Sequence, residues 1–162
     1  MSSNTKSKII LIIVSSVYLL DRLTKLAVVE KIKLFDSVTV INGFFELTNV
    51  QNTGAAFSLF AQAGEAFRVP FLLASTVAAI GLLLYFLGKA NPQDTLVVAA
   101  LAMILGGAFG NLTDRLVYGY VIDFINWHIG EHYWPAFNIA DSGITVGVCI
   151  LGIEIALRKK TI

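Results

Sequence analysis

Charged residues are scarce in this chain of 162 residues: they make up 14% of it, whereas 56% are hydrophobic. The mean hydropathy of +0.75 is far above that of an ordinary water-soluble domain and argues against a soluble monomer. The 12 basic and 11 acidic residues nearly cancel, so the net charge of +1 provides no positive field for nucleic acid. The single cysteine, Cys149, excludes an intramolecular disulfide. What remains is a compact membrane protein with a single domain over residues 1–162.

Long apolar segments, in contrast, are abundant. Residues 69–88 and 95–113 contain no charged side chain, and each segment is long enough to cross a bilayer as a helix. Two further segments are apolar except for a few polar residues near one end. We therefore predict an all-α membrane protein, a bundle of four transmembrane helices with spans at approximately residues 9–29, 69–88, 95–113 and 137–157.

Four spans place both termini on the same side of the membrane. Lys6 and Lys8 lie next to the first span and residues 158–160 form a basic cluster, so we expect cytoplasmic termini. The long connections then lie on the opposite side. There, residues 36–50 alternate between apolar and polar around a turn at Asn42-Gly43, which predicts a β-hairpin. We expect a small extracytoplasmic β element and loops that cap this side of the bundle.

Several polar residues within or beside the spans lie near that same side of the membrane. The first and third helices run away from the terminal side and the fourth returns to it, so the polar ends of all three meet at one interface. Asn111 shares a helix face with Arg115, and Asn138 shares one with Asp141. The residues that gather at this interface are Asp21, Asn111, Asp114, Arg115, Asn138 and Asp141.

Two carboxylates at this interface, Asp123 and Asp141, are the strongest candidates for chemistry. Two carboxylates in a poorly solvated site do not both ionise easily, so they share a proton and titrate as a unit. One of them can then take a proton from water while the other donates a proton to a carbonyl oxygen. Each residue also has a simpler interpretation on its own, because Asp141 in the first turn of a helix stabilises that helix.

Five short motifs give the chain a resemblance to a known family. They are DRLTK at residues 21–25, NTGAAF at 52–57, GNLTDR at 110–115, VIDF at 121–124 and FNIADS at 137–142. In this order, and with four spans around them, they resemble the successive motifs of bacterial lipoprotein signal peptidase, the type II signal peptidase. The resemblance covers nearly the whole chain.

The resemblance implies a membrane-embedded aspartic endopeptidase of the bacterial cytoplasmic (inner) membrane, with its active site near the extracytoplasmic face. Its substrates would be prolipoproteins, cleaved on the N-terminal side of a diacylglyceryl-modified cysteine, so its partners are this lipid-modified substrate and membrane lipid. No metal, cofactor or oligomer is required. The resemblance assigns catalysis to Asp123 and Asp141, substrate binding to Asn52, Asn111, Arg115 and Asn138, and a structural or supporting role to Asp21, Lys25, Gly54 and Asp114.

Two other functions are compatible with parts of the sequence. Residues 128–132 spell H-x-x-E-H, a pattern of zinc peptidases, but the pattern needs a helix and Gly130 interrupts it. We therefore interpret His128 and His132 as packing residues. A small proton-coupled transporter is the second alternative, since its spans also carry carboxylates. Transport sites usually lie near the midplane of repeated helices, and this chain contains no repeat.

Overall fold

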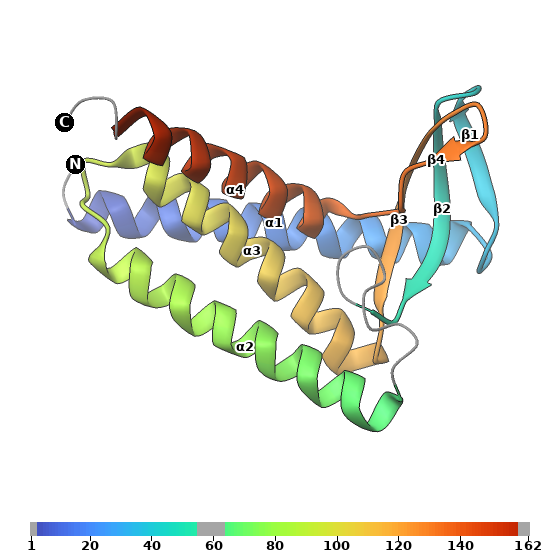
Figure 1. Cartoon of the computed structure of the whole chain (residues 1–162), viewed down its shortest axis with the longest axis horizontal. Coiled ribbons are helices and arrows are strands. Elements are labelled where there is room, and N and C mark those ends of the chain that lie inside the picture. The colour runs from blue at the N-terminus through green and yellow to red at the C-terminus, as the bar shows by residue number, and fades with distance from the viewer. Residues whose placement is uncertain (1–2, 55–63, 159–162) are drawn as a thin grey trace.

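The structure is a computed structural model that describes residues 3–54 and 64–158. It is mostly helical, and one helix covers all or nearly all of each of the four predicted segments. α1 begins and α4 ends at the same end of the bundle (Figure 1). Residues 55–57 of the NTGAAF motif and the two lysines at 159–160 lie outside the described residues. The helices are α1 (Ser3–Lys31), α2 (Glu65–Lys89), α3 (Thr95–Tyr118) and α4 (Ile139–Arg158).

Helix α3 is the centre of the bundle and contacts α1, α2 and α4. Glycines allow this close approach, because a Cβ atom added at Gly107 would lie 2.3 Å from the carbonyl oxygen of Ala140 in α4. A Cβ atom at Gly110 would lie 2.5 Å from Oδ2 of Asp21 in α1. Both helices therefore pack directly against the backbone of α3, as small residues permit in membrane bundles.

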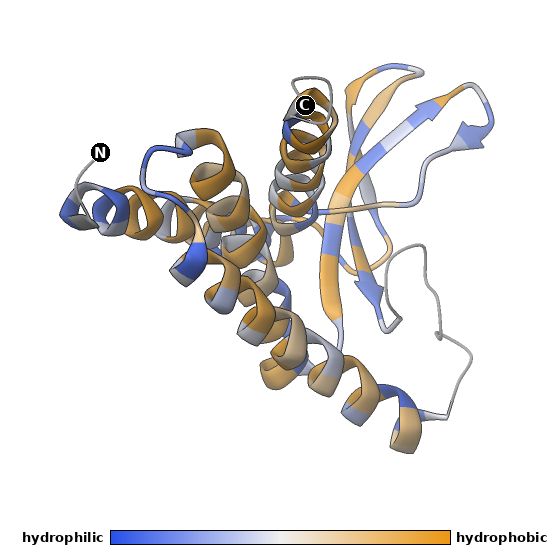
Figure 2. Ribbon diagram, turned by 60° about the vertical axis from the view of Figure 1, so that its left-hand side comes forward, coloured by the Kyte–Doolittle hydropathy of each residue, from blue (hydrophilic) through white to orange (hydrophobic). Residues whose placement is uncertain are grey.

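Three helices of the described residues are long and apolar enough to cross a membrane: α2, α3 and residues Ile139–Leu157 of α4. Figure 2 shows that apolar residues run along the helices. Many of these side chains face outward; Leu82 and Ile153, for example, are more than half exposed. A water-soluble protein does not expose so much apolar surface. Apolar surface of this extent is expected where helices face lipid.

A four-stranded antiparallel sheet lies at the end of the bundle remote from the start of α1 (Figure 1). The predicted hairpin is confirmed, although three residues join its strands instead of two, with Gly43 at φ 73°. The sheet is larger than predicted, because residues 121–124 are also a strand. All four of these side chains are buried, so the segment lacks the apolar–polar alternation that reveals a half-buried strand. The strands, in their order in the sheet, are β1 (Ser37–Ile41), β2 (Phe45–Asn52), β3 (Val121–Ile129) and β4 (His132–Tyr133).

The connection from α3 to the sheet determines where β3 lies. α3 ends at Tyr118, and Gly119 follows in the left-handed conformation with φ 80°. The amide of Gly119 donates to the carbonyl of Arg115 over 3.1 Å, a common way to end a helix. The chain then runs into β3, which pairs with β2 so that Asn52 lies opposite Val121. This register places the end of β2 beside Asp123.

Candidate active site

Asp123 lies in β3 with only 2% of its surface exposed, and its carboxylate is held by two amide groups. Nδ2 of Asn138 donates to Oδ1 over 2.6 Å, and Nδ2 of Asn52 donates to Oδ2 over 2.9 Å. Burial and the nearby charge of Asp141 raise the pKa of Asp123 to about 7, although the two amides oppose this rise. The carboxyl group therefore exchanges its proton near neutral pH.

Asp141 lies in the first turn of α4 and is partly exposed. Nδ2 of Asn111 in α3 donates to its Oδ1 over 2.8 Å. Each of the two aspartates is thus held by neutral amide donors, and the charge of one acts on the other. The structure brings together the two carboxylates that the sequence predicted as a pair.

Asn138 connects the two aspartates. It is fully buried immediately before α4, and its Oδ1 accepts the backbone amide of Asp141 over 2.9 Å, as an N-cap residue does. Its Nδ2 donates to Asp123, so one side chain both begins α4 and orients a carboxylate of β3. Asparagine suits this position because its amide offers a donor and an acceptor at once.

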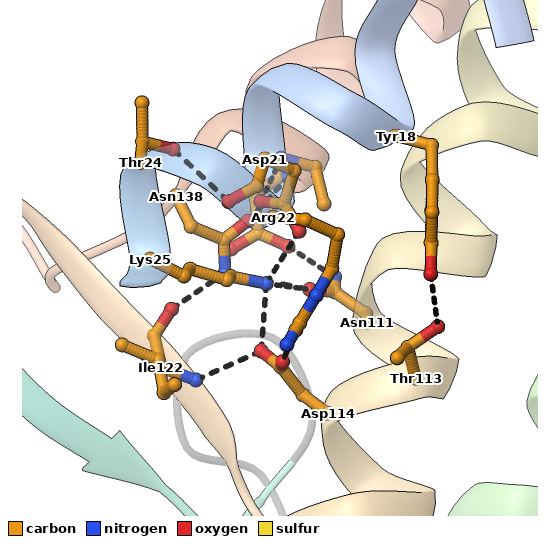
Figure 3. Close-up of polar contacts among 12 residues, drawn as sticks. Tyr18, Asp21, Arg22, Thr24, Lys25, Asn111, Thr113, Asp114, Ile122 and Asn138 are labelled. Carbon is orange, nitrogen blue, oxygen red and sulfur yellow. Dashed lines mark hydrogen bonds and ion pairs between the residues drawn. The ribbon is translucent and has the colours of Figure 1, made fainter. Parts of the chain in front are cut away.

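A second polar cluster lies next to the aspartates, between α1 and α3 (Figure 3). Lys25 is fully buried at its centre, with Nζ 2.8 Å from Oδ2 of Asp21 and 2.7 Å from Oδ2 of Asp114. Arg22 forms an ion pair with Oδ1 of Asp114. We call these four residues, Asp21, Arg22, Lys25 and Asp114, the charge cluster. Two carboxylates and two cations make it electrically balanced, which is what burial of charge requires.

The charge cluster also fixes the backbone around the aspartates. Oδ1 of Asp21 accepts the amide of Ala140 at the start of α4 over 2.9 Å. Oδ2 of Asp114 accepts the amide of Ile122, the neighbour of Asp123, over 3.2 Å. The supporting role expected for Asp21, Lys25 and Asp114 thus has a geometric basis. Arg22 was not predicted to contribute; the signal for it was its place in the DRLTK motif, one residue after Asp21.

The remaining predicted residues lie on the other side of Asp123. Nη2 of Arg115 donates to the carbonyl of Gly54 over 3.2 Å, and the amide of Gly54 donates to Oδ1 of Asn52 over 2.9 Å. Asn52 thereby joins Asp123 to the turn that follows β2. All ten predicted site residues therefore fall within two adjoining networks at one end of the bundle.

A cavity of about 670 Å³ adjoins this site. At its polar end lie Asn52, Arg115 and Asp141, and between α2 and α4 it is lined mainly by apolar residues such as Leu72 and Ile144. Three aromatic residues that the sequence did not predict as part of the site also line it. They are Trp127, Trp134 and Phe137.

The H-x-x-E-H pattern lies on β3, a turn and β4, not on a helix. His128 is buried and stacks on Tyr133 with ring centroids 4.5 Å apart, whereas His132 is exposed. Within residues 3–54 and 64–158, no group of three His, Cys, Asp or Glu side chains is arranged to hold a metal ion. The packing role expected for His128 agrees with its stacked ring.

Fold and site together define a helical membrane protein with a pair of buried or half-buried aspartates beside a largely apolar cavity. The family described as signal peptidase (SPase) II matches residues 13–157. The chain belongs to this family and is a peptidase.

Individual relatives extend over almost the whole chain. A lipoprotein signal peptidase of Syntrophus aciditrophicus is 43% identical over 157 residues, which cover 96% of this chain and 98% of the relative. One of Paraburkholderia phymatum is 47% identical over 144 residues, 89% of this chain and 85% of the relative. A solved structure described as a bacterial membrane enzyme has a TM-score of 0.79 and 33% identity, and the match covers 98% of this chain and 90% of that one.

Proposed function

We propose that this protein removes signal peptides from prolipoproteins and that Asp123 and Asp141 are its catalytic residues. Its relatives carry the name lipoprotein signal peptidase, which supports the reaction. The observation that carries the catalytic assignment is the bridge through Asn138, which donates to one carboxylate and accepts the backbone amide of the other residue.

The aspartates share one proton near neutral pH in this proposal. The charge cluster is already balanced, so its cations do not offset the charge of Asp123 and Asp141. With the single positive charge of the nearby Arg115, the two carboxylates reach a net charge of zero only when one proton stays on the pair. The ionised aspartate takes a proton from the attacking water, and the protonated one donates to the carbonyl oxygen of the scissile amide. The pKa of Asp123, raised to about 7, supports this arrangement.

The lining of the cavity is consistent with a lipid-modified peptide as the substrate. Its polar end offers the amides of Asn52 and Asn111 and the guanidinium of Arg115, which can donate to the carbonyls of an extended peptide. Its apolar part between α2 and α4 suits a signal peptide or an acyl chain. We propose that cleavage occurs on the N-terminal side of a diacylglyceryl-modified cysteine.

The fourth span of the proposed membrane arrangement is α1. Its 29 residues are long enough to cross a bilayer, and its internal charges Asp21, Arg22 and Lys25 face partners within the protein. With cytoplasmic termini in the bacterial inner membrane, the sheet and both aspartates lie near the extracytoplasmic face. Lipoprotein precursors would then meet the site where their modified cysteine lies in the outer leaflet.

The decisive experiment measures cleavage of a purified diacylglyceryl-modified prolipoprotein by the full-length protein in lipid. We expect Asp123→Asn and Asp141→Asn each to reduce cleavage at least ~10⁴-fold, the order of magnitude lost when one member of a catalytic unit is removed. Asp36→Asn, which changes an exposed carboxylate near β1, is the control and should cleave normally.

A variant at either position that cleaves the substrate at the rate of the Asp36→Asn control would contradict the catalytic assignment. A substrate without the diacylglyceryl group tests the second part of the proposal. We expect it to remain uncleaved; equal cleavage of both substrates would show that the lipid is not recognised.

A further inference from the structure

Lys25 reaches beyond the charge cluster to a side chain that holds a catalytic aspartate. Its Nζ has three hydrogens, and two of them are used by Asp21 and Asp114. The third acceptor is Oδ1 of Asn111, at 3.3 Å, as Figure 3 shows. Because Lys25 is fully buried, no water competes for this contact.

This contact favours one orientation of the amide of Asn111. The oxygen of that amide is directed toward Lys25 and toward Nδ2 of Asn138, 3.4 Å away. The nitrogen therefore faces Asp141 and donates to it over 2.8 Å. A flipped amide would present its oxygen to the carboxylate of Asp141, an arrangement that an ionised carboxylate disfavours and a protonated one accepts.

We propose that Lys25 is a positioning residue for catalysis, which orients the amide of Asn111 so that its nitrogen donates to the carboxylate of Asp141. This proposal rests on the catalytic assignment made above. It gives the charge cluster a role in the reaction in addition to its role in folding, and Lys25 exerts this positioning role through its contact with Asn111.

The other charged groups around Asp141 do not explain this orientation. β3 contributes Asp123, α3 contributes Arg115 and Asp114, and α1 contributes Asp21 and Arg22. Of these, Arg115 donates to the carbonyl of Gly54 and Arg22 pairs with Asp114. Only Lys25 among the cations of the described residues has a recorded contact with the oxygen of Asn111. Its charge also opposes the rise in the pKa of Asp123.

A charge-neutral pair of substitutions separates orientation from simple electrostatics. Asp21→Asn with Lys25→Met removes one negative and one positive charge, and Arg22 still pairs with Asp114. Asp21→Asn alone is the matched control, because it retains the contact between Lys25 and Asn111. Activity of the full-length protein on the lipidated prolipoprotein is measured against pH, and kcat and KM are determined separately.

We expect the double variant to lose at least ~10-fold in kcat relative to Asp21→Asn, with KM within about twofold. The acid limb of its pH profile should move to higher pH, because an amide of Asn111 that is free to flip accepts a hydrogen bond from the protonated carboxyl group of Asp141. A thermal unfolding scan of each variant checks that the protein is folded. A double variant that keeps the kcat and the pH profile of Asp21→Asn would overturn the proposal.

A coupling measurement makes the result independent of stability. The effect of replacing Lys25 is measured again in an Asn111→Ala background, where the orienting contact no longer exists. We expect little further loss there, whereas a purely structural role predicts the same loss in both backgrounds. If the Met variant does not fold, Lys25→Gln in the Asp21→Asn background replaces it in the same cycle, and additive effects would again overturn the proposal. In either case Asp141→Asn stays inactive, which distinguishes failure of this proposal from failure of the catalytic assignment.

Discussion

The two polar networks of this protein bury carboxylates in different ways. In the charge cluster, Asp21 and Asp114 each face a cation, and both are fully buried. At the proposed catalytic site, the carboxylate of Asp123 is held by two neutral amides, and that of Asp141 by one. The difference is therefore between carboxylates in direct ion pairs and carboxylates held by amides, since the nearby Arg115 donates to the carbonyl of Gly54 instead.

This difference distinguishes the charge cluster, which holds the helices together, from the proposed catalytic site. In the charge cluster, ion pairs with Arg22 and Lys25 anchor the carboxylates of Asp21 and Asp114 within the bundle. At the proposed site, amide donors hold the carboxylate of Asp123 in place, whereas burial and the charge of Asp141 raise its pKa to about 7 against the effect of those amides.

The largest effect should come from breaking the balance of the charge cluster. Asp114→Asn removes the partner of both Arg22 and Lys25 and leaves excess positive charge in the bundle. We expect a loss of about 3–5 kcal/mol in stability, as when one member of a buried ion pair is removed. Thermal unfolding in detergent measures it, with Asp36→Asn as the exposed control. Equal melting temperatures for the two variants would mean that the cluster does not hold the fold.

At the proposed catalytic site, a single substitution should affect activity more than stability. Asn138→Ala removes the donor to Asp123 and the cap of α4. We expect cleavage to fall ~100-fold, within the range for a misplaced acid or base, and stability to fall by only about 1 kcal/mol for the lost cap. Kinetics and thermal unfolding of the same preparation test both parts. A large loss of stability with normal activity per folded molecule would contradict this prediction and would mean that Asn138 acts in folding instead of in the reaction.

The sequence predicted the helices and the members of the site better than it predicted the sheet. Long uncharged segments such as residues 69–88 define helices by composition alone. The order of the spans and motifs predicted that Asp123 and Asp141 lie at the same end of the bundle. Asp21 and Lys25 are four residues apart, which is the spacing of an ion pair on a helix. Strand β3 escaped prediction because residues 121–124 are buried on both faces.

The contacts within the site depend on distances that no local pattern contains. Arg22 and Asp114 are 92 residues apart, and their pairing follows from the close packing of α1 against α3. The contribution of Arg22 therefore could not be read from spacing. The cavity walls are also contributed by distant elements, so the role of Trp127 and Trp134 as cavity residues became visible only in the structure.

A smaller effect tests whether the charge cluster depends on close helix packing. A Cβ atom at Gly110 would lie 2.5 Å from Oδ2 of Asp21, so Gly110→Ala pushes α1 away from α3 or displaces the carboxylate from Lys25. We expect a loss of about 1–3 kcal/mol, typical of overpacking. Gly81→Ala in α2 is the control, since a Cβ atom there meets nothing within 4 Å. Gly110→Ala as stable as this control would show that α1 and α3 can separate without cost.

The finest test uses the pKa of Asp123, because two substitutions should move it in opposite directions. Asp141→Asn removes the neighbouring negative charge, so the pKa of Asp123 should fall below about 7 while burial keeps it raised. Asn52→Ala removes an amide that stabilises the ionised form, so the pKa should rise. Carboxyl ¹³C NMR of protein labelled at aspartate follows both titrations, with Asp123→Asn used to assign the signal. A pKa of Asp123 that stays unchanged in both variants would contradict this account. A shift in both directions would therefore show that the charge of Asp141 raises the pKa of Asp123 and that the amide of Asn52 lowers it, in addition to the larger effect of burial.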